Sequence, residues 1–187
     1  MTRPLPRPWR RFTLEPHDDG ALEQATHAFA YRVPSPLGPA ATFAFLSEIA
    51  SDAEWFPDFV DGAWESAAPH GVGSTRWFRS DLLWLRERFV AWTPGERFAF
   101  IGTETTLPLM RRFAEDYRFT PTPSGGTEVT WRILYTPRAV FRPLHPLLRP
   151  VFAKMFQEAA TAMEAALARE AGRGAAPGSK LSRAGAG

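Results

Sequence analysis

The chain has 187 residues, a length that suits one domain and is short for two. It contains no Cys, so disulfides and thiolate metal sites are excluded, and no apolar run approaches the roughly 20 residues that a membrane-spanning helix needs. Residues 1–16 and 171–187 each carry a net charge of +3, and the whole chain carries +2, so residues 17–170 carry −4. Because a nucleic-acid binder needs a basic face on its folded domain, we expect no nucleic-acid partner.

The two ends of the chain have the composition of flexible segments. Residues 1–20 are rich in Pro and Arg and have no hydrophobic period, and residues 172–187 are rich in Gly, Ala and Ser. We therefore expect a flexible basic arm over residues 1–20, a single domain over residues 21–171 and a disordered tail over residues 172–187. The arm lacks the apolar stretch of a secretory signal, so we expect a cytoplasmic protein.

The first predicted strand covers residues 25–33, where apolar and polar side chains alternate. The larger side chains of one face are His27, Phe29, Tyr31 and Val33. A short helix follows from Pro39 to about Ala50, since Pro suits a helix start and bulky apolar residues then recur every three positions. A second short turn carries Trp55 and Phe56 and ends at Pro57.

Six further segments read as strands because their residues alternate and because breaks rich in Gly, Pro or Asp separate most of them. They cover residues 62–68, 74–81, 84–93, 97–105, 111–120 and 125–135. The breaks are too short for helical crossovers, which favours antiparallel hairpins. The period then changes to that of a helix from about Leu144 to Glu170. This order predicts an α+β fold in which a curled, seven-stranded antiparallel sheet wraps on a long C-terminal helix, with two short helices after the first strand.

A curled sheet that one helix covers leaves a gap between the two layers. Such gaps hold small ligands, and we expect a cavity of about 300–1,000 Å³. Hydrophobic residues make up 44% of the chain and aromatic residues 13%, which is enough to line a cavity as well as to fill a core.

Four short motifs follow one another in the order of a known superfamily. They are the stretch from Phe43 to Ile49 followed by Trp55-Phe56-Pro57, the stretch from Gly71 to Arg76, the stretch from Glu87 to Phe98, and the stretch from Gly126 to Trp131. Over residues 25–170 this order resembles the START-like (SRPBCC) superfamily, whose members include polyketide cyclase/dehydratase-like proteins, lipid-transfer START domains and Bet v 1 allergens. The resemblance implies the helix-grip fold and a pocket for a hydrophobic small molecule that is polyketide- or lipid-like. Catalytic residues are not shared across this superfamily, so the resemblance assigns none.

Three carboxylates lie on strand faces that are otherwise apolar. They are Glu87, Glu104 and Glu115. A carboxyl group that faces a dry cavity has a raised pKa and can act as a general acid or base near neutral pH, as a cyclisation or dehydration needs. His27 is a fourth catalytic candidate, as a proton shuttle. The alternative for the carboxylates is a salt bridge to a neighbouring Arg in the wall, and the alternative for His27 is a hydrogen-bonded wall residue.

The expected ligand contacts come from the strand faces and from the apolar stripe of the last helix. They are Trp77, Arg79, Phe89, Phe100, Tyr117, Trp131, Phe152 and Phe156. No cofactor or metal is expected, because the four His lack the spacing of metal ligands and no dinucleotide or phosphate-binding motif is present.

The sequence leaves three functions open: an enzyme that acts by acid–base chemistry, a non-catalytic carrier of a lipid or other hydrophobic ligand, and a structural or coenzyme-delivery partner. An inward cluster of Glu with Tyr or His would favour the enzyme, whereas Glu residues that are exposed or paired with Arg would favour the carrier. Residues 142–149 mix Leu and Arg and suit a lid over the cavity, a transient membrane contact or a cap of the last helix. We expect a monomer or a homodimer.

Overall fold

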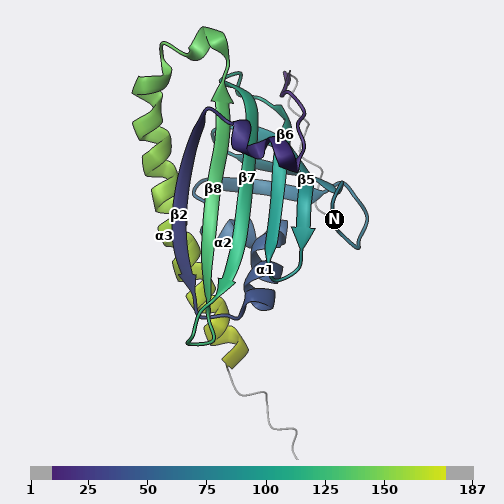
Figure 1. Ribbon diagram of the computed structural model, residues 1–187, viewed down its shortest axis with the longest axis vertical. Helices are drawn as coiled ribbons and strands as arrows, with labels where there is room; N and C mark the ends of the chain where they lie inside the picture. Colours follow the sequence, from purple (N-terminus) through teal and green to yellow (C-terminus); the bar gives the residue numbers. More distant parts are fainter. Residues whose placement is uncertain (1–9, 176–187) are drawn as a thin grey trace, which may run out of the picture.

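A computed structural model of the protein describes residues 10–175 and shows a curled antiparallel sheet packed against a long helix (Figure 1). The strands are β1 (Phe12–Thr13), β2 (His27–Ser35), β3 (Phe59–Trp64), β4 (Thr75–Ser80), β5 (Trp84–Thr93), β6 (Arg97–Thr105), β7 (Met110–Pro121) and β8 (Thr127–Pro137). The helices are α1 (Pro39–Ser47), α2 (Asp52–Trp55) and α3 (His145–Ala175). Three short 3₁₀ turns are η1 (Asp19–Gln24), η2 (Ile49–Ser51) and η3 (Ala139–Phe141).

Seven strands form one continuous path in the order β2-β8-β7-β6-β5-β4-β3, and every neighbouring pair is antiparallel. Helix α3 lies beside β2 along the length of the sheet, and α1 and α2 lie between β2 and β3 in the chain (Figure 1). The predicted α+β helix-grip fold is confirmed. The eighth strand, β1, pairs with β6 and was not predicted.

Residues 12–14 belong to the folded part of the protein. Leu14 is only 2% exposed, and a Cβ atom added at Gly102 would come within 2.7 Å of Leu14 Cδ1, so the glycine makes room for this side chain. The expectation of a flexible arm over residues 1–20 is therefore wrong for this stretch, because Leu14 fills a gap in the sheet that the sequence does not reveal. Residues 1–9 lie outside the described residues.

Helix α3 is longer than expected and reaches Ala175. The predicted tail therefore starts too early, and its remaining residues, 176–187, lie outside the described part of the chain.

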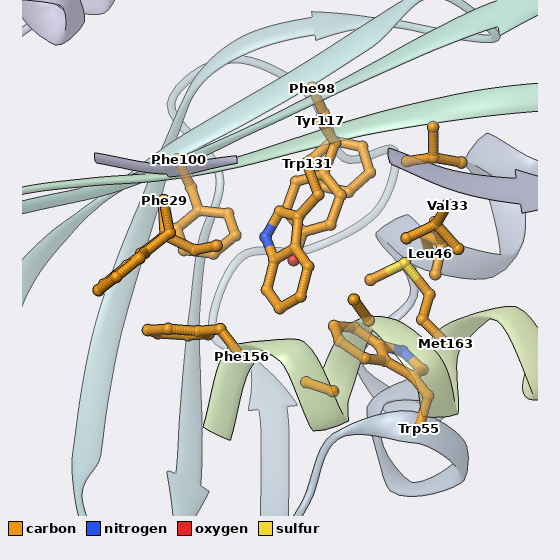
Figure 2. Packing of buried hydrophobic residues seen from close by; sticks show 14 of the residues in the cluster. Phe29, Val33, Leu46, Trp55, Phe98, Phe100, Tyr117, Trp131, Phe156 and Met163 are labelled. Atoms are coloured by element: carbon orange, nitrogen blue, oxygen red, sulfur yellow. The ribbon is translucent and has the colours of Figure 1, made fainter. Parts of the chain in front are cut away.

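The core is aromatic and lies between the concave face of the sheet and α3. Trp131 is fully buried: its indole stacks on the Tyr117 ring at 5.8 Å between ring centres, and the rings of Trp55 and Phe156 meet it edge-on at 5.6 and 5.7 Å (Figure 2). Each such side chain contributes about 2–3 kcal/mol through burial, with a further contribution from the ring geometry. Trp131 thus joins the sheet to α2 and α3.

Candidate functional site

Four charged side chains are buried together on the concave side of the sheet. Arg76 is 3% exposed, Glu87 3%, Asp52 4% and Glu115 6%. They come from β4, β5, α2 and β7. We call these four residues the floor cluster. Buried charges are uncommon in protein interiors unless they are paired, so the partners of each group decide what the cluster can do.

The hairpin between β4 and β5 places Arg76 opposite Glu87. The Ser80 amide donates to the Leu83 carbonyl at 2.8 Å, which closes a tight turn, and the register counted back from that turn pairs Arg76 with Glu87. Arg76 Nε donates to Glu87 Oε2 at 2.5 Å. This pair is charge-assisted and wholly shielded from water, so each partner depends on the other.

Arg76 also holds the cluster to the helices. Its Nη1 donates to the Ser47 carbonyl at 3.3 Å, and its Nη2 lies 4.0 Å from Asp52 Oδ2. Burial alone would lower the pKa of Arg76, but Glu87 and Asp52 outweigh burial and raise it. Arg76 is therefore a fixed positive charge.

Glu115 accepts two hydrogen bonds through Oε2, from the Tyr117 hydroxyl at 2.6 Å and from Trp131 Nε1 at 2.9 Å. Burial raises the pKa of Glu115 to about 7, although both hydrogen bonds favour the charged form. Near neutral pH this carboxyl group is thus poised between its acid and its base form.

Asp52 has a still higher pKa, about 8, because burial outweighs the attraction of Arg76. Its Oδ1 atom has no hydrogen-bond partner in residues 10–175, and the same is true of the neighbouring Trp55 Nε1. Burial also raises the pKa of Glu87, against the pull of Arg76. Asp52 is therefore mainly protonated at neutral pH. Its own Oδ1 atom and the neighbouring Trp55 Nε1 are free to bind a ligand.

All four members of the floor cluster line a pocket of about 60 Å³, which we call the floor pocket. Its other walls are apolar: Phe78, Leu85 and Phe100 from the sheet, and Phe152, Met155 and Phe156 from α3. Trp55 and Tyr117 also line it. The arrangement gives one polar patch in an apolar chamber, as in sites that orient a small molecule.

Two smaller chambers adjoin the floor pocket, with volumes of about 30 and 20 Å³, and Met110 and Phe113 contribute to the walls of all three. The expected cavity of about 300–1,000 Å³ is therefore wrong for this state of the protein, because aromatic side chains occupy much of the gap. A ligand of more than a few heavy atoms has to displace side chains. Met110 and Met155 are adaptable enough for that role.

The chamber of about 30 Å³ lies under the connection between β8 and α3. We call this chamber the mouth pocket and residues 138–154 the mouth segment. Phe141, Leu148 and Phe152 of the mouth segment line the mouth pocket, as does His145, whose Nε2 forms a 3.0 Å hydrogen bond with the Tyr135 hydroxyl. The mouth segment thus covers one end of the internal space.

Five of the residues predicted from the sequence meet the floor pocket as expected, together with Glu87. They are Phe100, Glu115, Tyr117, Phe152 and Phe156. Phe89 and Trp131 are fully buried next to it and support it: the Arg76 guanidinium lies 5.2 Å from the Phe89 ring centre, and Trp131 holds Glu115. Whether any of these residues binds or reacts stays a prediction.

Glu104 does not join the cluster. Strand β6 bulges between Gly102 and Glu104, since these residues pair with the consecutive residues Glu87 and Arg86 of β5. The extra residue reverses the alternation, so Glu104 faces outward, where it pairs with Arg11 at 2.7 Å and with Arg86 at 3.6 Å. The prediction of an inward Glu104 is wrong for this reason.

Trp77 and Arg79 are also on the opposite face from the one predicted. Along β4 the buried residues are Arg76, Phe78 and Ser80, and the residues between them are only partly buried. Side chains alternate along a strand, so Trp77 and Arg79 point away from the floor pocket. The prediction chose the wrong face of this strand.

His27 lies at the mouth end, apart from the floor cluster. Its ring lies 4.1 Å from that of His145, and both residues line an outer depression of about 360 Å³ together with Arg142. Burial, together with His145 and Arg149, lowers the pKa of His27. His27 lines the outer depression and Glu115 lines the floor pocket, and the two pockets share no residue. The structure therefore does not bring His27 and Glu115 together in one site.

Sequence reasoning missed Asp52, Trp55 and Arg76 as site residues. If a two-residue turn is placed at Asp81 and Leu82, counting back along the two strands pairs Arg76 with Glu87. The sequence therefore contained the information that these two residues face each other. Asp52 looks like a helix cap in the sequence, and its burial depends on how α2 packs against α3.

Within residues 10–175, no group of three or more His, Asp or Glu side chains is arranged to hold a metal ion. In the same part of the chain no helix has the length and apolar character to span a membrane.

Comparison with known proteins identifies the family. Residues 26–168 match the family model described as "Polyketide cyclase / dehydrase and lipid transport". The chain belongs to this family. The family lies within the superfamily that the motif order resembles, and together with the helix-grip fold it indicates that the protein binds a hydrophobic small molecule. No curated protein matches the chain.

Solved structures show the same fold. The Zhui aromatase/cyclase from Streptomyces sp. R1128 aligns with a TM-score of 0.63 and 14% identity, over 79% of this chain and 94% of its own. A START superfamily protein from Mycobacterium smegmatis aligns with a TM-score of 0.65 and 9% identity, over 77% of this chain and 99% of its own. At these identities the similarity establishes the fold, and the function has to be argued from the site.

Proposed function

We propose that the protein binds one polyketide- or lipid-like molecule between the sheet and α3 and catalyses its cyclisation or dehydration by general acid–base chemistry. The observation that carries this proposal is the buried pair of Asp52 and Glu115 in one pocket, with pKa values raised to about 8 and about 7. Two buried carboxyl groups whose pKa values lie near neutral pH can each give or take a proton there, so together they can act as an acid–base pair.

The floor pocket offers a polar group on the ligand a defined place. Trp55 Nε1 is a free donor, and protonated Asp52 is a second one. A carbonyl oxygen of the ligand would accept a hydrogen bond from Trp55 Nε1, its leaving hydroxyl group would accept one from Asp52, and its carbon skeleton would lie against Phe100, Phe152 and Phe156. Leaving such buried donors unpaired costs about 1–3 kcal/mol each, which binding would recover.

A dehydration then needs two proton transfers. Glu115 in its carboxylate form removes a proton from the carbon next to the ligand carbonyl, while protonated Asp52 gives its proton to the leaving hydroxyl group. A C–H bond and a C–O bond break, a carbon–carbon double bond forms, and water leaves. Arg76 and Glu87 neutralise each other and keep the field of the site fixed while these protons move.

The first test is native mass spectrometry of the gently purified protein, followed by solvent extraction and identification of what is released. The proposal predicts one bound hydrophobic molecule per chain. A chain that carries no ligand, and that binds neither a fatty acid nor a polycyclic aromatic ketone, would contradict it.

The second test concerns catalysis. Glu115→Gln keeps the size of the side chain and should abolish turnover of the identified ligand while the protein still folds and binds it. Glu104→Gln is the matched control, because Glu104 faces outward, and should keep full activity. Full activity of the Glu115 variant would remove this residue from the mechanism.

A carrier without catalysis is the second candidate, and one observation favours it. Glu87 is paired with Arg76, and Glu115 already accepts two hydrogen bonds, so both fit a structural polar network as well. A ligand that is released unchanged after prolonged incubation would support the carrier over the enzyme.

We further propose that the protein acts in the cytoplasm, without nucleic acid, as a monomer or homodimer. Cell fractionation and light scattering of the purified chain test these points. Recovery of the chain with ribosomes or DNA would contradict them.

A further inference from the structure

The mouth segment carries most of the exposed apolar side chains of the described residues. Seven large hydrophobic residues between positions 10 and 175 are well exposed, and four of them lie here: Val140 at 76%, Leu147 at 72%, Val151 at 64% and Leu144 at 43%. Single exposed apolar residues are normal, but a contiguous group marks a surface that meets something else.

The same segment forms the wall of the mouth pocket with its other face. Phe141, Leu148 and Phe152 point inward and line that pocket, which shares Phe152 and Phe156 with the floor pocket. The segment is therefore apolar on both sides. In Figure 1 it is the green turn, with the first turns of α3, that projects beyond the end of β8. The exposed apolar face therefore belongs to the same segment that covers the mouth pocket.

The charge of the mouth segment indicates which kind of partner its exposed face binds. The mouth segment contains three Arg and one Lys and no acidic residue, whereas residues 17–170 as a whole carry −4. Arg142 is exposed, has no ion-pair partner in residues 10–175 and lines the outer depression of about 360 Å³. Arg149 is exposed as well, but its guanidinium packs over the Phe29 ring at 5.2 Å from the ring centre. Apolar side chains flanked by basic ones are the pattern of helices that lie at the surface of anionic membranes.

We propose that the mouth segment docks on an anionic lipid surface, with Leu147 and Val151 in the acyl region and Arg142 at the phosphates. This proposal rests on the ligand-binding function above and adds the source of the ligand, which enters from the membrane through the mouth pocket. A second copy of the chain fits the surface less well, because a symmetric contact would bring like charges together.

The test is co-sedimentation of the full chain with vesicles. The wild-type protein should bind vesicles of phosphatidylcholine with phosphatidylglycerol at least about tenfold better than vesicles of phosphatidylcholine alone, and added salt should weaken this binding. Leu147→Gln with Val151→Gln should reduce binding about tenfold or more. Val72→Gln is the matched control, because Val72 is 68% exposed but lies between β3 and β4, and should bind like wild type.

Three results would overturn the docking surface: equal binding to both kinds of vesicle, unchanged binding of the double variant, or a dimer that the double variant turns into a monomer. Ligand binding measured without vesicles keeps the two proposals apart. A chain that binds its ligand but ignores anionic vesicles overturns the docking surface alone. A chain that binds vesicles but holds no ligand supports the docking surface and overturns the proposed function.

Discussion

The two ends of the internal space differ in the side chains that form them: buried charged groups at the floor and apolar groups at the mouth. At the floor, four charged side chains are each at most 6% exposed, and three of them are fixed by short hydrogen bonds to named partners. At the mouth, apolar side chains face both the pocket and the solvent, and residues 138–154 include no acidic residue. The difference separates two tasks: the floor can orient and protonate a polar group, whereas the mouth can admit an apolar molecule.

The largest effect should come from removing the cation of the floor. Arg76→Met leaves Glu87 buried without a partner and should cost about 3–5 kcal/mol of unfolding free energy, as breaking a buried ion pair does. Urea unfolding followed by Trp fluorescence measures this loss. Arg79→Met, on the outward face of the same strand, is the control and should stay within about 0.5 kcal/mol. Equal losses of unfolding free energy in the two variants would show that the buried ion pair of Arg76 contributes no more to stability than an outward Arg does.

The next effect is a pH dependence of stability. Glu115 has its folded-state pKa raised from 4.5 to about 7, so its contribution to stability is full below about pH 4.5 and is lost as the pH rises through 7. Asp52 acts in the same direction. The unfolding free energy of the wild type should fall between pH 4.5 and 8, and that of Glu115→Gln should fall by about 3 kcal/mol less. Parallel pH curves for the two proteins would contradict the raised pKa.

Most of the fold followed from the sequence because the signals that set it are local. Short breaks between alternating segments predicted all seven strands of the main path, and β5 and β6 have the predicted ends. The strand β1 and the burial of Leu14 did not follow, since they depend on a gap at Gly102 that only the assembled sheet creates.

The site was harder to predict because it depends on which face of each strand points inward. On β4 both faces carry an Arg and an aromatic ring, so composition could not choose between Arg76 and Arg79. On β6 the bulge at Gly102 reversed the face of Glu104 after the alternation had placed Phe98 and Phe100 correctly. Only pairing across strands resolves such cases.

A smaller effect is expected at Glu104, which sharpens the contrast between inward and outward carboxylates. Its ion pairs with Arg11 and Arg86 are partly exposed, so Glu104→Gln should change the unfolding free energy by less than about 1 kcal/mol. Ligand binding should not change. Turnover should not change either, and a loss of turnover as large as that in Glu115→Gln would mean that the bulge does not turn Glu104 outward.

The smallest effect should be seen at the mouth. Leu147 is 72% exposed, so Leu147→Gln should leave the unfolding free energy within about 0.5 kcal/mol of wild type. Thermal unfolding monitored by circular dichroism measures it. A strongly destabilised variant would show that Leu147 serves the fold, and the surface would then need no partner to explain it.

The floor pocket holds a carboxyl group that is able to exchange a proton near neutral pH. Carbon-13 NMR of the protein labelled at its Glu carboxyl carbons tests this directly. One Glu signal should titrate with a pKa of about 7 and should be missing from Glu115→Gln. If every Glu carboxyl group titrates below about pH 5, as unperturbed ones do, Glu115 has no raised pKa and cannot exchange a proton near neutral pH in the way proposed.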